Sequence, residues 1–211
     1  YNVILSNVTN FYIDMAYNPH PDEPGLTWGG YVDEFRTWDA RPFDIYKSTW
    51  TTVTGSPLDP KVTAAKKIEL LPEAKKRIVG VQAHLFAETI RNFDMVEYYV
   101  FPKIFGLAER GWNADLLPGQ TKAAYNRHIG DYELPTLERE GINFHIGMPG
   151  IKEENGMLLM NKQYDNAEIR YTTDGSEPTA QSTLWTEPVK ATGKVVKAKM
   201  FYLGKESKTT R

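Results

Sequence analysis

The sequence predicts an α/β fold followed by a small antiparallel β-sandwich, and three observations support that prediction. Two nearly continuous runs of apolar, β-branched and aromatic residues, 3–14 and 77–86, have the composition of strands buried on both faces of a parallel sheet. Helical patterns follow the second run. The order strand, long crossover, strand, helix, helix is typical of a parallel α/β sheet or barrel. After about Gly147 the pattern changes to short alternating runs.

Between the two predicted strands the chain is expected to form loops and short helices. Proline and glycine residues predict a loop over 15–30, and residues 44–50 are expected to form a helical turn. Asp59 followed by Pro60 is typical of a helix start, because aspartate caps the first turn and proline fits the first helical position. We therefore expect a short helix over 64–70.

Two longer helices are predicted after the second strand. Apolar residues at spacings of three and four indicate a helix over 93–107 that ends at Gly111. Pro102 lies inside this helix and is expected to kink it, because proline lacks the N–H that the helix needs. A further helix is expected over 121–139, closed by Gly141.

The last third of the chain indicates short antiparallel strands. Strands are expected around Leu158 and over 168–173 and 195–202, where apolar and lysine residues alternate in the last segment. Residues 174–178, Asp-Gly-Ser-Glu-Pro, predict a turn. We therefore expect two domains, an α/β domain over 1–147 and a β-sandwich over 148–211.

Composition and charge exclude several classes of protein. With 25 lysine and arginine residues against 27 aspartate and glutamate residues, the net charge is −2. A nucleic-acid-binding protein would carry a basic excess. Without cysteine the chain has no disulfides and no thiol chemistry. No apolar run approaches the roughly 18 residues that a transmembrane helix needs. The chain opens inside a strand, without an initiator methionine or signal peptide, so we expect it to be a piece of a longer protein.

Both predicted strands end on an aromatic residue and a carboxylate. Residues two apart on a strand point to the same side, so Tyr12 shares a face with Asp14, and Phe86 with Glu88. The carboxyl ends of parallel barrel strands are where active sites lie. Aromatic faces and carboxylates together suit a sugar ring, which has an apolar face and hydroxyl donors. The alternative is that the rings belong to the core and the acids cap neighbouring helices.

Other residues give weaker signals. The four histidines, His20, His84, His128 and His145, lack the spacing of metal ligands, so we expect neither a metal nor a cofactor. His84 is expected to line a wall rather than to act as a base. The acidic turn at 174–177 is too short for a calcium loop and is expected to be a hairpin turn.

Residues 11–39 and 80–112 resemble the last part of the catalytic barrel of family 20 glycoside hydrolases, the β-N-acetylhexosaminidases. The matching motifs are Tyr12-Ile13-Asp14, Gly25-Leu26-Thr27-Trp28, Phe86-Ala87-Glu88, Phe101-Pro102 and Ala108-Glu109-Arg110-Gly111-Trp112. Residues 171–178, Tyr-Thr-Thr-Asp-Gly-Ser-Glu-Pro, resemble the characteristic motif of the chitobiase/hexosaminidase C-terminal module. The resemblance implies the C-terminal portion of a TIM (β/α)8 barrel, strands seven and eight with their helices, followed by a β-sandwich.

The resemblance also implies a reaction and a role for each site residue. These enzymes hydrolyse terminal N-acetylglucosamine or N-acetylgalactosamine with retention, using the substrate's own acetamido oxygen as nucleophile. Tyr12 would donate a hydrogen bond to that oxygen and stabilise the oxazoline. Asp14 and Glu88 would accept hydrogen bonds from the C4 and C6 hydroxyls. Trp28 and Phe86 would form walls of the sugar site.

Two departures from the family pattern shape the prediction. The family's eighth-strand tryptophan is Phe86 here, which covers less of a sugar and lacks the indole N–H. The Asp-Glu pair that acts as general acid and acetamido orienter has no counterpart in this sequence. We therefore expect a chain that binds sugar but does not turn it over by itself.

The partners and location follow from the same resemblance. The expected partners are N-acetylhexosamine-containing glycans, with self-association or pairing with the missing part of the barrel. Secretion or a periplasmic location is implied by the family. The alternative is a non-catalytic carbohydrate-binding or interaction module.

Overall fold

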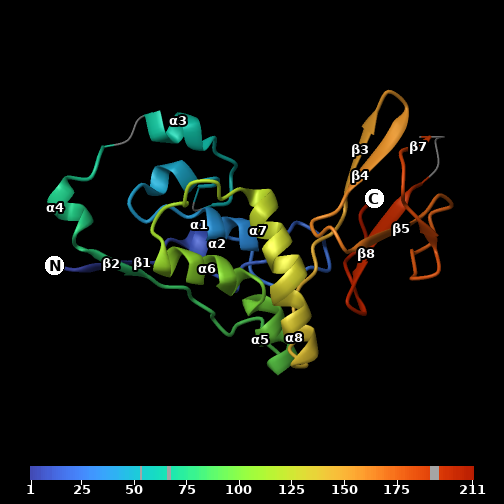
Figure 1. The fold of residues 1–211 in the computed structure, drawn as a ribbon, viewed down its shortest axis with the longest axis horizontal. Coiled ribbons are helices and arrows are strands. Elements are labelled where there is room, and N and C mark those ends of the chain that lie inside the picture. The colour runs from blue at the N-terminus through green and yellow to red at the C-terminus, as the bar shows by residue number, and fades with distance from the viewer. Residues whose placement is uncertain (53, 66–67, 191–194) are drawn as a thin grey trace. The chain divides into compact units, whose positions relative to one another are not determined.

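The computed structural model describes residues 1–52, 54–65, 68–190 and 195–211, which form two compact units, Tyr1–Lys122 and Ala123–Arg211 (Figure 1). In the first unit, β1 (Val3–Leu5) pairs in parallel with β2 (Ile78–Val81). An isolated parallel bridge between Tyr12 and His84 continues the contact between the two segments. The two segments therefore lie side by side up to the predicted site.

The predicted strand over 3–14 is wrong in its middle, where residues Val8–Phe11 form the short helix α1. The polar side chains explain the difference. Thr9 donates to the Asn10 side chain, and the Asn10 amide donates to the carbonyl of Arg36, 2.7 Å away. Asparagine and threonine side chains that bond locally compete with the strand ladder. The second strand is also shorter than the predicted 77–86.

Short helices separate the two strands. The loop over 15–30 is followed by α2 (Glu34–Asp39), which we did not predict, and by the 3₁₀ helix η1 (Ile45–Ser48) within the predicted helical turn. Asp33 caps α2 by accepting a hydrogen bond from the Arg36 amide at 2.8 Å.

The helix predicted over 64–70 is displaced toward the N-terminus. Helix α3 spans Pro60–Ala65, and Asp59 accepts a hydrogen bond from the Lys61 amide at its start. Residues 66 and 67 lie outside the described part of the chain. The next helix, α4, spans Pro72–Lys75, so the predicted segment over 68–70 is not helical.

Two helices rather than one kinked helix follow β2. Helix α5 spans Phe93–Val100 and α6 spans Lys103–Trp112, and the helical conformation is interrupted between them at Phe101-Pro102. Helix α6 packs closely against α2 at Gly106. A Cβ atom on Gly106 would lie 2.2 Å from Thr37 Oγ1 and 2.4 Å from the Trp38 amide nitrogen, so only glycine allows this approach.

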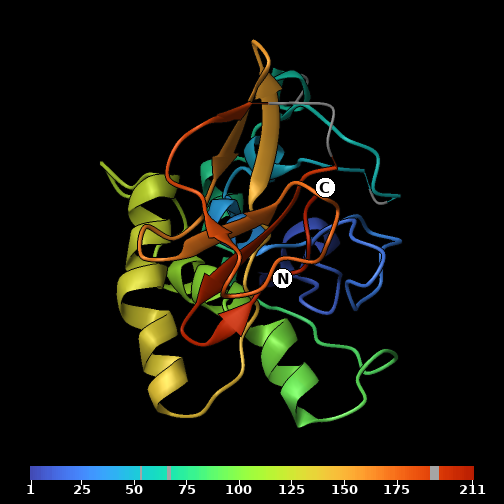
Figure 2. The ribbon, with the colours of Figure 1, turned by 90° about the vertical axis from the view of Figure 1, so that its right-hand side faces the viewer.

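The helix predicted over 121–139 is a run of three consecutive helical segments, α7 (Lys122–His128), the π-helical η2 (Ile129–Glu133) and α8 (Leu134–Arg139). Figures 1 and 2 show this run in yellow as a nearly continuous rod. Tyr202 donates a hydrogen bond to the Gly130 carbonyl at 2.7 Å, which joins the rod to the β-structure of the second unit. The domain boundary at 147/148 remains a prediction.

The second unit contains two antiparallel sheets, as the alternating pattern predicted. One has the order β3-β4-β7, formed by Gly150–Glu154, Met157–Asn161 and Val189–Lys190. The other has the order β6-β5-β8-β9, formed by Thr183–Leu184, Glu168–Thr172, Lys197–Tyr202 and Lys205–Glu206. Met160 of the first sheet and Ile169 and Ala198 of the second are buried in one apolar cluster. Among the described residues of both units, no helix has the length and apolar character needed to cross a membrane.

Candidate functional site

The candidate site lies where the chain leaves the β1–β2 pairing. Tyr12 forms the bridge to His84, and residues 13 and 14 then turn instead of continuing a strand. The Ile13 amide donates to the His84 carbonyl at 2.9 Å, which holds the turn against the second segment. Tyr12 and Asp14 are therefore fixed at the end of the paired region, although the backbone is a turn and not the expected strand end.

Four rings gather at this end. The Tyr12 ring centroid lies 5.4 Å from that of Phe86, 6.0 Å from that of Trp28 and 5.0 Å from that of His84. His84 and Phe86 stack with centroids 5.3 Å apart and planes 3° apart. Trp28 and Phe86 are 52% and 42% exposed, so both leave ring surface open to a ligand. His84 contributes to a wall of rings, as its position in the sequence indicated.

Gly25 brings Trp28 to this cluster. Its φ of 119° is unfavourable for other residues, and a Cβ atom there would lie 2.8 Å from the Asp14 carbonyl oxygen. The next residue, Leu26, bridges Met15, and the Leu26 amide donates to the Asp14 carbonyl at 3.3 Å. The loop is thus pressed against the segment that carries Asp14, and Trp28 follows two residues later.

Asp14 is the most unusual group of the site. It is only 1% exposed, and neither carboxylate oxygen has a hydrogen-bond partner within the described residues. Burial raises the pKa of Asp14, and the negative charge of Glu88 raises it further. The nearby amides of Asp14 and Phe86 and the positive charge of Lys103 act in the opposite direction. These amides do not reach hydrogen-bonding geometry with either oxygen, so a ligand that donates hydrogen bonds to the buried carboxylate would stabilise it.

The structure brings together the residues that the sequence singled out. Tyr12, Trp28 and Phe86 share one ring cluster, and Glu88 is exposed but close enough to act on the charge of Asp14. Their individual roles remain predictions.

One residue of this site, Lys103, was not predicted from the sequence. Its side chain is fully buried, and Nζ donates to the carbonyls of Ile13 at 2.8 Å and Met15 at 2.7 Å, on either side of Asp14. A basic residue at the start of a largely apolar helix was the signal that could have indicated it. Within the described part of the chain, no three His, Asp or Glu side chains are grouped to hold a metal ion.

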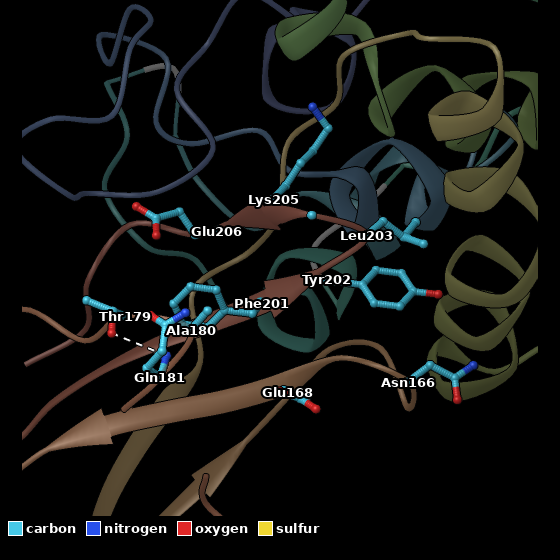
Figure 3. A pocket seen from close by; sticks show the side chains of 11 residues that line it. Asn166, Glu168, Thr179, Ala180, Gln181, Phe201, Tyr202, Leu203, Lys205 and Glu206 are labelled. Atoms are coloured by element: carbon cyan, nitrogen blue, oxygen red, sulfur yellow. Dashed lines mark hydrogen bonds between the residues drawn. The ribbon is translucent and has the colours of Figure 1, made fainter. Parts of the chain in front are cut away.

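The second unit carries a groove of about 760 Å³ (Figure 3). Glu168, Phe201 and Glu206 are cross-strand partners and form a row along it. Figure 3 shows Tyr202 pointing away from this row. Glu168 pairs with Arg170, and Glu206 pairs with Lys199 at 2.8 Å. The carboxylates of the groove are therefore already neutralised within the unit.

Two family models match the chain. Residues 1–115 match the catalytic domain of glycosyl hydrolase family 20, and residues 149–211 match the chitobiase/beta-hexosaminidase C-terminal domain. The first match contains every site residue described above.

Relatives and solved structures give similar results. The chain is 29% identical to the N,N'-diacetylchitobiase of Vibrio harveyi over 93% of its own length, and 26% identical to a beta-hexosaminidase of Vibrio vulnificus over 83%. It spans only 25% and 23% of the length of these two relatives. An N-acetyl-beta-hexosaminidase structure from Streptomyces plicatus, solved in complex with Thio-NAglucal, is 28% identical with a TM-score of 0.48, covering 68% of this chain and 23% of that chain.

The catalytic-domain model covers more than half of the 211 residues. The buried carboxylate and the ring cluster both lie inside the matched region. The chain therefore belongs to glycosyl hydrolase family 20.

Proposed function

We propose that this chain forms the sugar-holding part of a retaining β-N-acetylhexosaminidase that acts on terminal N-acetylglucosamine or N-acetylgalactosamine. The observation that carries the proposal is the Asp14 carboxylate, which is buried beside a cluster of half-exposed rings and whose oxygens make no hydrogen bond of normal geometry within the described residues. A pyranose supplies what this arrangement lacks, namely hydroxyl donors beside an apolar face. Asp14 and Glu88 accept hydrogen bonds from the C4 and C6 hydroxyls.

The rings support the same ligand. Trp28 and Phe86 expose ring surface on which the apolar face of a sugar can lie, and Tyr12 contacts both. Phe86 offers a smaller surface than the tryptophan of the family pattern, so the chain holds its sugar less tightly than a relative with tryptophan there.

Tyr12 is assigned to the chemical step. The acetamido oxygen of the substrate attacks the anomeric carbon as the bond to the leaving oxygen breaks, and the leaving oxygen takes a proton from a general acid. The Tyr12 hydroxyl donates to the acetamido oxygen as the oxazoline ring closes, and water then opens that ring with overall retention. Because Asp14 and Glu88 are engaged with hydroxyls, we assign the proton donor and the acetamido-orienting aspartate to residues outside these 211.

The partners of the site follow from this assignment. The substrates are glycans that end in an N-acetylhexosamine, and a protein that acts on such glycans is exported to the periplasm or beyond. The exposed edges of the two-stranded β1–β2 pair are covered by the remaining part of the barrel or by a second copy of the chain.

Hydrolysis of 4-nitrophenyl N-acetylglucosaminide and N-acetylgalactosaminide by the full gene product tests the proposal, with NMR detection of the first anomer released. We expect turnover with the β-anomer formed first. The isolated chain is expected to bind N-acetylglucosamine without turnover, because general acid catalysis is worth roughly 10²–10⁴-fold. Mixing it with a separately made upstream segment is expected to restore activity.

The outcomes separate the proposal from its alternative. Inversion at the anomeric carbon, or turnover by the isolated chain, would overturn the assignment of the carboxylates. Sugar binding by the full gene product without any turnover would instead favour a non-catalytic carbohydrate-binding module.

A further inference from the structure

We propose that Lys103 is a positioning residue for Asp14, which holds the turn that carries this carboxylate by binding the carbonyls on both sides of it. The inference rests on the proposed function of Asp14 as a sugar ligand and extends it to a residue that does not touch the sugar. It assigns a site role to the first residue of α6, about 90 residues away in the sequence.

The local backbone explains why such a residue is needed. Residues 13 and 14 turn out of the strand pairing, so the carbonyls of Ile13 and Met15 lose the donors that a neighbouring strand would provide. Buried carbonyls need a donor. Lys103 Nζ donates to both, at 2.8 Å and 2.7 Å, and thereby fixes the carbonyl groups of the residues before and after Asp14.

The lysine is itself held from several sides. Nζ lies 3.7 Å from the centroid of the Tyr17 ring, and the Tyr17 hydroxyl donates to the Phe101 carbonyl at 2.9 Å, just before α6 begins. The Lys103 carbonyl accepts a hydrogen bond from Thr37 Oγ1 at 2.8 Å. Helix α2 and the end of α5 therefore define where the ammonium group lies.

The charge of Lys103 supports Asp14 in addition to its hydrogen bonds. Burial lowers the pKa of Lys103 to about 7, opposed by the carboxylates of Glu34, Glu23, Asp33 and Asp14. When protonated, Lys103 favours the ionised form of Asp14. A deprotonated amine still has two N–H donors for the two carbonyls, so the positioning contacts persist when the charge is lost.

A double-mutant cycle tests the proposal in the full gene product. Lys103→Met keeps an unbranched side chain, one atom shorter, but removes its donors, and we expect kcat/KM to fall by about 10²-fold, because a small displacement of a positioned group has that effect. In an Asp14→Ala background, Lys103→Met is expected to lower kcat/KM by less than about threefold. Lys103 acts through Asp14, so the effects of the two substitutions are not additive. Lys103→Arg, which keeps two donors, is expected to recover part of the loss.

Arg110→Met is the matched control. Arg110 is also a buried cation of α6, 2% exposed, but its guanidinium pairs with Glu109 at 3.3 Å and makes no described contact with the turn that carries Asp14. Its effect is expected to be the same with and without Asp14. An equal loss for Lys103→Met in both backgrounds would overturn the proposal and leave Lys103 with a structural role only. Thermal unfolding is measured for each variant, and Lys103→Leu, which also lacks donors, replaces Lys103→Met in the cycle if the latter does not fold.

A second measurement does not need activity. NMR titration of the Asp14 carboxyl is expected to show a higher pKa in Lys103→Met than in the wild type, together with changes in the amide signals of residues 13–15. If the wild type neither binds nor hydrolyses hexosaminides but these changes occur, the proposed function is wrong while the coupling stands. If the protein is active and neither the titration nor the cycle shows coupling, the role of Lys103 is wrong.

Discussion

The two units each present carboxylates beside an aromatic ring, but they differ in what those carboxylates contact. In the first unit, Asp14 is buried and has no hydrogen-bond partner among the described residues. In the groove of the second unit, Glu168 and Glu206 are exposed and already paired with Arg170 and Lys199.

The difference separates the site that we propose for sugar binding from the groove of the second unit. A buried acceptor that makes no hydrogen bond lowers the stability of the fold until a ligand supplies one. An exposed ion pair changes the free energy of folding little in either direction. Residue types alone do not distinguish the two regions, because both combine acids and aromatics. The hydrogen-bond and ion-pair partners of those residues do distinguish them, so a change in the site and a matched change in the second unit are expected to have different effects.

The largest effect is expected from the loss of the Tyr12 hydroxyl. Tyr12→Phe should lower kcat by roughly 10²–10³-fold with little change in KM, because a single donor positioned for the transition state has that value. Tyr202→Phe is the control. It loses the hydrogen bond to the Gly130 carbonyl and should cost about 1 kcal/mol of stability without changing kcat. Steady-state kinetics with an aryl N-acetylglucosaminide measure both, and a raised KM at unchanged kcat would mean that Tyr12 only lines the site.

Removal of the buried carboxylate comes next. Asp14→Ala is expected to weaken the binding of N-acetylglucosamine by roughly 10- to 10²-fold, the range for a hydrogen bond to a charged group. Glu168→Ala in the groove should leave binding unchanged. Calorimetric titration of the two variants gives the comparison directly. Equal losses of sugar affinity in both variants would contradict the proposal that Asp14, and not the groove, binds the sugar.

A smaller effect is expected from the ring that departs from the family pattern. Phe86→Trp enlarges the stacking surface and should strengthen sugar binding by roughly two- to tenfold, which corresponds to the free energy contributed by one aromatic contact. Phe201→Trp makes the same change in the groove and should have no effect on sugar binding. Weaker binding by the Phe86 variant would indicate that the pocket is already filled by the benzyl ring.

The smallest effects concern stability as a function of pH, and the two regions are expected to differ in sign. Lys197 and Thr209 lower the pKa of Glu177, in the second unit, to about 2, so its contribution is complete above pH 4.5 and is lost as the pH falls through 2. Burial raises the pKa of Asp14, so its ionisation costs stability above the raised pKa, and the cost disappears on acidification.

Thermal unfolding between pH 2 and 7 separates the two groups. Glu177→Gln should remove a small acid-induced loss of stability, which is limited because Glu177 is exposed to solvent. Asp14→Asn should raise the melting temperature at pH 7. A destabilised Asp14→Asn variant would show that the carboxylate has internal partners after all.

The sequence allowed prediction of the elements whose pattern is local. The apolar runs indicated where β1 and β2 lie, and Asp59 followed by Pro60 indicated the start of α3. The same reasoning failed for α1, because asparagine and threonine side chains between two apolar stretches make local hydrogen bonds that a strand pattern does not reveal. Helix α2 was missed because it is only six residues long, although Asp33 is a recognisable cap.

The residues of the candidate site could be named from the sequence, but the buried residue that holds the turn beneath them was not named. Tyr12, Asp14, Trp28, Phe86 and Glu88 could be named from motif and strand parity. Lys103 was not named, because a basic residue at the start of a largely apolar helix is only a weak signal and does not show that the lysine is fully buried or that two distant carbonyls need its donors. Such contacts depend on the packing of α6 against the rest of the unit, which is a property of the folded chain.

The close approach of α2 and α6 has a consequence for engineering this protein. Gly106 lies one turn after Lys103 on the same helix, and a methyl group there would overlap Thr37 and Trp38, so any replacement displaces the helix that carries the lysine. A library that randomises only the residues around the sugar would never sample this position. Random mutagenesis, in contrast, would return Gly106 variants that resemble active-site knockouts although the glycine contacts no substrate.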